Sequence, residues 1–562
     1  MDALKQSNTD PSKVQAMTSF QNLAHKGDRQ GGVLHSQRLG EKLAGDRKET
    51  SPYEVTYMDE IKWRPLCEQI LDKEDVKKFK DAIHNDWFFE MYVEDLPMWS
   101  YIGDAIKEDL IFGDVDGSFT VLYPHVHFSF GVNNGNIVEA QVVSDKSIKV
   151  VLEDTEDDTV IHFSYSVDWF ESEVKWKDRM SLYDDSKFTS TTSEVHWLSI
   201  INSVVLVLLL TAFLILILVR ILKNDFVGDL ELDDDEVGED TSGWKLIHGD
   251  VFRFPQFISL FCSAVGTGLQ LTVVTFTIFI LALTGYVSTT RRGSILAATV
   301  VLYCILSVVG GFTSGRLYLQ MGGKNWTRNI LLTAFLFPGP CFLIFCFANT
   351  VALLHQSTAA LPFSAIFTVL ALYCILAFPL TVVGGILAKN KANPKFEAPT
   401  RTTKVAREIP TEIPWYKTRT VQFLVSSFLP FSAIYIELNY IFASMWGHHI
   451  YTLFGILFLA LLLLIIVSSF MSVTMLYFQL AREDHRWWWT TFINGGSTGV
   501  LIYLYSFIYY FFRSEMNGWL QGSFFFGYMA AISYAFFLIL GTASFFSGLT
   551  FVRFIYSRVK CD

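Results

Sequence analysis

The stretch SVVLVLLLTAFLILILV, residues 203–219, contains no charged side chain. A helix needs about 20 apolar residues to cross a membrane, because it rises about 1.5 Å per residue and the hydrocarbon core is roughly 30 Å thick. Extended to its apolar limits, the stretch predicts a first transmembrane helix over 198–222. The residues before this stretch are rich in polar and charged side chains, whereas the segment after residue 256 consists mainly of similar apolar runs.

Eight more runs of this kind follow. Soluble core helices do not recur at this density, so the sequence predicts a polytopic α-helical membrane protein with nine transmembrane helices. The polar stretch MWGHH, residues 445–449, divides the sixth run from the seventh. The eight runs cover 257–286, 294–314, 329–350, 359–388, 421–444, 450–478, 489–512 and 521–552.

Composition supports this division of the chain. Of 562 residues, 51% are hydrophobic and 18% are charged, against about 25% charged in soluble proteins. The segment 257–562 contains 19 Lys and Arg but only 8 Asp and Glu, so the net charge of −11 arises from the acidic front. These numbers exclude a single globular domain, a disulfide-rich scaffold and a basic-faced nucleic-acid binder.

Basic residues predict the orientation. Loops after odd-numbered spans, with the tail 553–562, contain most Lys and Arg beyond residue 222, whereas loops after even-numbered spans contain three. Because such residues favour the cytosolic side, we expect the tail and the acidic loop 223–256 in the cytosol and residues 41–197 in the lumen. The eight acids between residues 229 and 240 predict a solvated spacer or, alternatively, a site for a basic partner. Residues 1–40 contain no apolar signal core, so we expect an atypical N-terminus.

Residues 41–197 predict a luminal, β-sandwich-like domain with antiparallel strands. Apolar residues alternate over 125–130 and 161–167, with a turn at 133–135 between strands. A short helix is expected over 73–84, where Val76, Phe79 and Ile83 have helical spacing. One polar strand face is either a solvated surface or a metal site, the former being the more common; its histidines are His125, His127 and His162.

Glu437 is the ionisable residue that lies deep in a predicted span. A charge at such depth costs about 2.5–3.5 kcal/mol on insertion scales, so it is expected to face a cavity or a partner. Pro430, seven residues earlier, predicts a break in this helix. A broken helix with a buried acid is typical of transporters, whereas a structural or recognition role is the commoner alternative.

Two further features carry alternatives. His448 and His449, at the predicted luminal mouth, are candidate pH-sensitive groups or ordinary loop residues. Glycines recur in the predicted spans and favour close helix packing, with recognition of another protein's helix as the alternative. These glycines are Gly266, Gly268, Gly310, Gly311, Gly315, Gly384, Gly385, Gly495, Gly496, Gly499, Gly541 and Gly548.

The chain ends Lys560-Cys561-Asp562. A lysine two positions before an acidic C-terminus on the cytosolic side indicates a sorting address. The sequence has neither a P-loop nor an H-E-x-x-H pair, so we predict no enzyme, no cofactor and no bound metal.

Several segments together resemble the nonaspanins, the transmembrane 9 superfamily or endomembrane protein 70 family, over roughly residues 39–562. Members of the family begin with a signal peptide, and residues 1–38 stand in its place here. We therefore expect either that the first transmembrane helix carries the N-terminal domain across the membrane or that the start of the gene product lies upstream. The segments are DLPMW (95–99) with YIGD (101–104), HWLSIINS (196–203), GDVFRFP (249–255), residues 430–455, TFINGGSTG (491–499) and the Lys-x-Asp terminus.

The resemblance implies a multi-pass protein of Golgi and endosome membranes. Its tail, through Lys560 and Asp562, would bind coatomer, and its role would be sorting and surface delivery of client membrane proteins, including those with glycine-rich helices. The rival hypothesis is an ion- or solute-coupled transporter that uses Glu437. A third reading, with less support, is a receptor for a luminal ligand.

Overall fold

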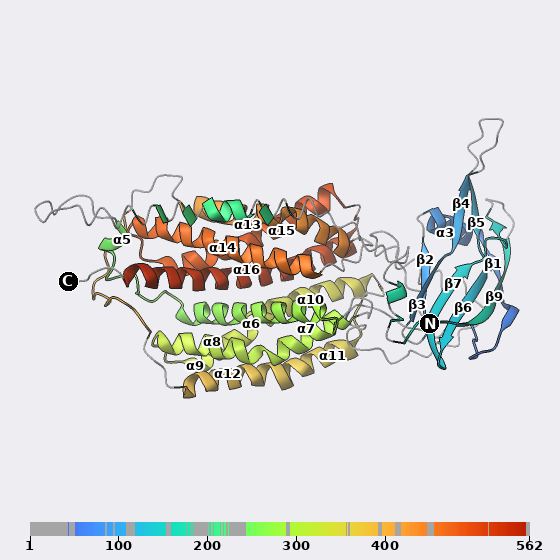
Figure 1. Cartoon of the computed structure of the whole chain (residues 1–562), viewed down its shortest axis with the longest axis horizontal. Helices are drawn as coiled ribbons and strands as arrows, with labels where there is room; N and C mark the ends of the chain where they lie inside the picture. The colour runs from blue at the N-terminus through green and yellow to red at the C-terminus, as the bar shows by residue number, and fades with distance from the viewer. Residues whose placement is uncertain are drawn as a thin grey trace, which may run out of the picture.

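The computed structural model consists of a β domain and a helical bundle (Figure 1). The β domain lies beyond one end of the bundle, and α5 (Gly243–Leu246) lies at the other end. The structure describes residues 51–183 and 243–557, with scattered positions between 201 and 223 and Leu43. Its gaps are 85–86, 94–95, 108–117, 153–158, 177, 180, 288–292, 356, 358–359, 392–395, 411–417, 447–453, 515 and 517.

Within the described part of the β domain, nine strands form three sheets. The largest sheet has the order β1-β9-β6-β7, β2 pairs with β3, and the third sheet has the order β4-β5-β8. The strands are β1 (Ile61–Leu71), β2 (Phe88–Val93), β3 (Leu96–Tyr101), β4 (Gly103–Lys107), β5 (Ser118–Leu122), β6 (His125–Asn133), β7 (Asn136–Ser144), β8 (Val150–Val151) and β9 (Thr159–Glu171). An N-terminal β-rich region is therefore confirmed.

Two predictions for this domain that depend on residues close together in the sequence, a short helix and a turn, are confirmed. Helix α3 (Lys73–His84) has the predicted bounds, and its apolar residues are buried. The β6–β7 hairpin turns at Asn134 and Gly135, whose φ angles of 51° and 80° are both positive. Two successive positive φ values are typical of a type I′ turn, whose twist matches the flanking strands.

The prediction of an all-antiparallel domain is wrong. Strands β6 and β9 pair in parallel at the centre of the largest sheet, whereas β9 with β1 and β6 with β7 are antiparallel. Alternation of apolar residues identifies a strand and its buried face, but both pairing directions satisfy it. The direction is decided by the course of the chain between the two strands.

The bundle contains helices of very different lengths. Several membrane-length helices are assembled from two shorter ones, and the π-helical turn η2 (Tyr373–Ala377) joins α11 to α12. The helices are α6 (Ile258–Leu283), α7 (Ser294–Ile305), α8 (Ser307–Gln320), α9 (Trp326–Leu336), α10 (Pro338–Leu354), α11 (Phe363–Leu372), α12 (Phe378–Asn390), α13 (Arg419–Trp446), α14 (Phe454–Ala481), α15 (Trp487–Phe512) and α16 (Trp519–Tyr556).

Within the described residues, seven helical stretches are long and apolar enough to cross a membrane. They correspond to seven of the nine predicted spans. The eighth, α15, has 26 residues and no charged side chain, but its Trp, Tyr, Asn, Gly, Ser and Thr content lowers its hydropathy. The first predicted span, 198–222, lies mostly outside the described residues. A total of nine spans therefore stays a prediction.

The recurring glycines are packed inside the bundle. A methyl group on Gly311 would overlap the Thr381 carbonyl oxygen, and one on Gly384 would overlap the Val308 carbonyl oxygen. These two contacts bring α8 and α12 backbone to backbone. Each of the other ten glycines singled out above also faces a neighbouring helix of this chain at short range. Close packing, the first of the two alternatives, is confirmed for these positions.

Candidate functional site

Helix α13 runs without interruption from Arg419 to Trp446, with Pro430 inside it. The predicted break at Pro430 is therefore wrong. Proline removes one amide donor from a helix but does not force the chain to leave it when neighbouring helices supply contacts. Here the Ser426 hydroxyl, one turn before Pro430, donates to the Asn494 carbonyl oxygen of α15 at 3.1 Å. Such interhelical contacts hold α13 against its neighbours across the proline.

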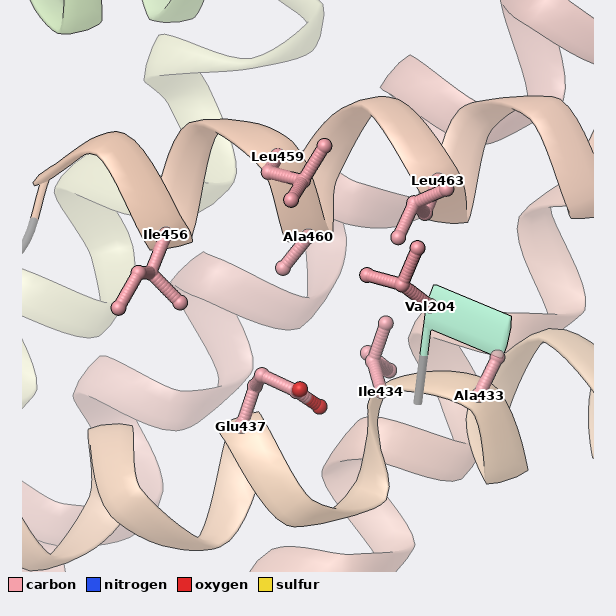
Figure 2. A pocket seen from close by; sticks show the side chains of 8 residues that line it. All are labelled: Val204, Ala433, Ile434, Glu437, Ile456, Leu459, Ala460 and Leu463. Carbon is pink, nitrogen blue, oxygen red and sulfur yellow. The ribbon is translucent and has the colours of Figure 1, made fainter. Parts of the chain in front are cut away.

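Glu437 is buried, with 8% of its surface exposed. It lines a small pocket between α13 and α14 with a volume of about 10 Å³, which is room for about one water molecule. Figure 2 shows the Glu437 side chain directed from α13 into this space. The other lining residues are apolar: Val204, Ala433, Ile434, Ile456, Leu459, Ala460 and Leu463.

The first predicted span contributes to this pocket through Val204. Nearby, Val207 packs in one buried cluster with Ala433 of α13 and with Val467 and Met471 of α14. Described residues of 198–222 therefore contact both α13, which carries Glu437, and α14, which forms the other wall of the pocket. This arrangement makes the pocket a place where the segment that follows the β domain meets the helical bundle.

A second polar site lies near α5, at the end of the bundle far from the β domain. Asp250, 5% exposed, accepts hydrogen bonds from the Arg253 guanidinium at 2.6 Å, the Thr403 hydroxyl at 2.9 Å and the Arg407 amide at 3.0 Å. Arg407 Nε also donates to Glu483 at 2.8 Å. We call these five residues the clasp.

The clasp joins three connections that are distant in sequence: the segment before α6, the segment after α12 and the turn between α14 and α15. Thr403 also donates its amide to the Gly249 carbonyl oxygen at 2.9 Å. Burial alone raises the pKa of the Asp250 carboxyl group, but the hydrogen bonds from Arg253, Arg407 and Thr403 outweigh it and hold the pKa below its ordinary value. The GDVFRFP motif was the only sequence signal for this site, and it did not indicate the partners.

The C-terminal end of α16 is fastened beside the clasp. The Tyr556 hydroxyl donates to the Trp244 carbonyl oxygen of α5 at 2.6 Å, and both residues are fully buried. Trp487 of α15 donates its indole N–H to the Val251 carbonyl oxygen at 2.8 Å. The last helix of the chain therefore ends at the opposite end of the bundle from the β domain (Figure 1).

Several predicted site residues lie outside the described part of the chain. These are the tail residues Lys560 and Asp562, the loop residues His448 and His449, and the acidic run 229–240. Their assignments stay predictions.

The three histidines singled out in the N-terminal domain lie on one polar face of the largest sheet. They are His125 and His127 of β6 and His162 of β9. His125 and His127 are hydrogen-bonded to serines of β9, and His162 lies 3.8 Å from Glu68 of β1. Among the residues that the structure describes, no three His, Cys, Asp or Glu side chains form a group suited to a metal ion.

Residues 495–499 read Gly-Gly-Ser-Thr-Gly and match the G-x-S-x-G spacing of serine hydrolases. That spacing requires a sharp turn between a strand and a helix. Ser497 lies instead inside α15, where its hydroxyl donates to the Asn494 carbonyl oxygen at 2.6 Å. The match is therefore not a nucleophile elbow.

Together, the helices, the membrane-length apolar stretches and the appended β domain define a multi-pass α-helical membrane protein. The endomembrane protein 70 family model matches residues 19–519. The chain belongs to this family, the transmembrane 9 superfamily.

Curated relatives match over nearly the whole chain. The chain is 47% identical to transmembrane 9 superfamily member 3 of Arabidopsis thaliana, over 94% of this chain and 88% of the relative. It is 41% identical to member 1 of Mus musculus, with the same two coverages. It is 42% identical to putative phagocytic receptor 1b of Dictyostelium discoideum, over 93% and 88%. No solved structure matches the chain.

Proposed function

We propose that this protein sorts other membrane proteins in Golgi and endosome membranes, with its tail bound by coatomer and its β domain in the lumen. The observation that carries the proposal is the position of the C-terminal end of α16. Helix α16 ends at Tyr556, anchored at the end of the bundle opposite the β domain. Lys560-Cys561-Asp562 follows four residues later. The tail therefore begins where a cytosolic coat protein could reach it while the β domain faces the other compartment.

Client binding is the second part of the proposal. The glycines, for which recognition of another protein's helix was the alternative to close packing, are covered by neighbouring helices of the same chain. Clients would then contact the outer surface of the bundle, the β domain or both. One relative is named putative phagocytic receptor 1b. That name supports a role for this family in the handling of cell-surface proteins.

Replacing Lys560 and Asp562 with alanine is expected to move the protein from the Golgi toward later compartments, because the basic and acidic groups of the address are both removed. Imaging of the full chain with a Golgi marker measures the shift. Cys561→Ala is the matched control, since it changes the residue between them and keeps both charges. An unchanged distribution of the double variant would refute the address.

The second candidate function is transport coupled to an ion or a proton. Its support is the buried carboxylate of Glu437 beside a pocket, since such residues mark ion pathways in many membrane proteins. The pocket has room for about one water molecule, so a continuous path would require α13 and α14 to separate. This requirement makes sorting the better supported of the two.

Flux into liposomes separates the two functions. If the protein transports, purified wild type should move protons or solute and Glu437→Gln should abolish that flux, because the amide keeps the size but not the charge. Leu459→Val, which trims the same pocket wall, should leave it unchanged. For a sorting protein we expect no flux from any of the three proteins and unchanged surface levels of clients in cells that carry Glu437→Gln.

A further inference from the structure

The parallel pairing of β6 with β9 brings two histidines beside two serines. His125 lies opposite Ser164 in the register and His127 opposite Ser166. Because side chains alternate along a strand, all four point to the same face of the sheet. Asp168, two residues after Ser166, lies on this face as well.

These side chains form an unbroken series of contacts. His125 Nδ1 lies 2.8 Å from Ser164 Oγ, and His125 Nε2 lies 3.0 Å from Ser166 Oγ. Ser166 Oγ is also 2.7 Å from His127 Nδ1. His127 Nε2 lies 3.3 Å from the Asp168 carboxylate. We call the five residues, in this order, the serine–histidine chain.

With both imidazoles neutral, the hydrogen bonds can run in one consistent direction. A neutral His127 whose proton is on Nε2, the nitrogen nearer Asp168, accepts at Nδ1 from the Ser166 hydroxyl. Ser166 then accepts from His125 Nε2, and His125 accepts at Nδ1 from the Ser164 hydroxyl. All three hydrogen bonds between the histidines and the serines are then made while both imidazoles are neutral.

Protonation of His125 would place a cation inside the sheet. His125 is only 5% exposed, and both of its ring nitrogens are within hydrogen-bond distance of serine hydroxyls. Burial already lowers the pKa of His125.

The surrounding charged groups do not offset the free-energy cost of charging the buried His125 side chain. Asp145, after β7, is the acid that acts on His125, and it is held in hydrogen bonds from the amide and hydroxyl of Ser147. His162 of β9 and Glu68 of β1 are both mostly exposed and lie 3.8 Å apart. Lys146, next to Asp145, lies 3.5 Å from Asp104 of β4. Asp168 is the acid that His127 already contacts.

We propose that the serine–histidine chain is a pH-sensitive site, in which His125 couples the β6–β9 pairing to the acidity of the compartment that the β domain faces. In the paired state His125 stays neutral. When the strands separate, His125 reaches water and takes up a proton near the ordinary histidine pKa of about 6.5. The open state then binds more protons than the closed state, so acid favours opening by up to about tenfold per pH unit below about 6.5.

Hydrogen–deuterium exchange of the full chain in lipid nanodiscs tests this. Protection factors of peptides from β6 and β9, corrected for the intrinsic pH dependence of exchange, should fall about fivefold to tenfold between pH 7.4 and pH 5.5. Peptides from β2 and β3, which contain no histidine, should keep theirs. This comparison within the wild-type protein needs no variant.

Two variants sharpen the test. His125→Gln keeps a hydrogen-bonding side chain that does not titrate in this range, and it should remove the fall in protection. His162→Gln, which lies on β9 but outside the serine–histidine chain, should leave the fall unchanged. Equal protection at both pH values in the wild type would overturn the proposal, as would a fall of the same size in His125→Gln.

Discussion

Replacing Gly311 with alanine is expected to destabilise the helical bundle by about 3 kcal/mol or more, near or above the upper end of the usual overpacking range. The added methyl group would overlap the carbonyl oxygen of Thr381 on α12. A side chain can rotate away from such an overlap, but a backbone carbonyl can move only with its helix. The α8–α12 contact would therefore have to open along its length.

Gly339→Ala is the matched control. Gly339 also lies in a helix, α10, but a methyl group there would meet nothing within 4 Å. Glycine costs about 1 kcal/mol relative to alanine inside a helix, so this substitution should be neutral or stabilising. Thermal unfolding in detergent, with the fraction of monodisperse protein, measures both variants. Equal stability of Gly311→Ala and wild type would show that the two helices do not pack this closely.

Replacing Asp250 with alanine is expected to cost about 1–3 kcal/mol, the range for buried hydrogen-bonding groups that lose their partner, because the Arg253 side chain is 32% exposed and water can solvate it in part. The substitution removes the acceptor of three hydrogen bonds and leaves the Arg253 guanidinium without its carboxylate. It should also release the segment after α12 from the segment before α6. Limited proteolysis near residues 400–407, together with thermal unfolding, measures the release.

Glu54→Ala is the control for Asp250→Ala. Glu54 pairs with Arg64 at 2.7 Å, but both side chains are exposed, so the loss should be below about 1 kcal/mol. Acid should act in the same direction as Asp250→Ala. The pKa of Asp250 is lowered in the folded state, so its contribution is present above the ordinary aspartate pKa of about 3.9 and is lost as the pH falls through the folded value. If Asp250→Ala unfolds at the wild-type temperature, the clasp does not stabilise the bundle.

Some features were predictable from the sequence because they depend on residues close together in the chain. The apolar runs gave the positions of the long helices, including the separation of α13 from α14. The Asn134-Gly135 turn and helix α3 were predicted for the same reason. Glu437 was identified as a buried acid because its surroundings in the sequence are apolar on both sides.

Other features could not be read from any local pattern. The continuity of α13 across Pro430 depends on contacts with neighbouring helices such as that between Ser426 and Asn494. The role of the glycines depended on whether another helix of the same chain covered them.

By itself, the sequence determined that the chain crosses a membrane several times and has a β-rich front, because hydrophobic length and alternation act within about 20 residues. The tertiary structure alone decided that β6 and β9 run in parallel, that Asp250 is bonded to Thr403 and Arg407, and that Val204 lines the same pocket as Glu437. The physical reason is separation along the chain. The Asp250 contacts join residues 153 and 157 positions apart, and only the packing of whole helices and strands brings such residues together.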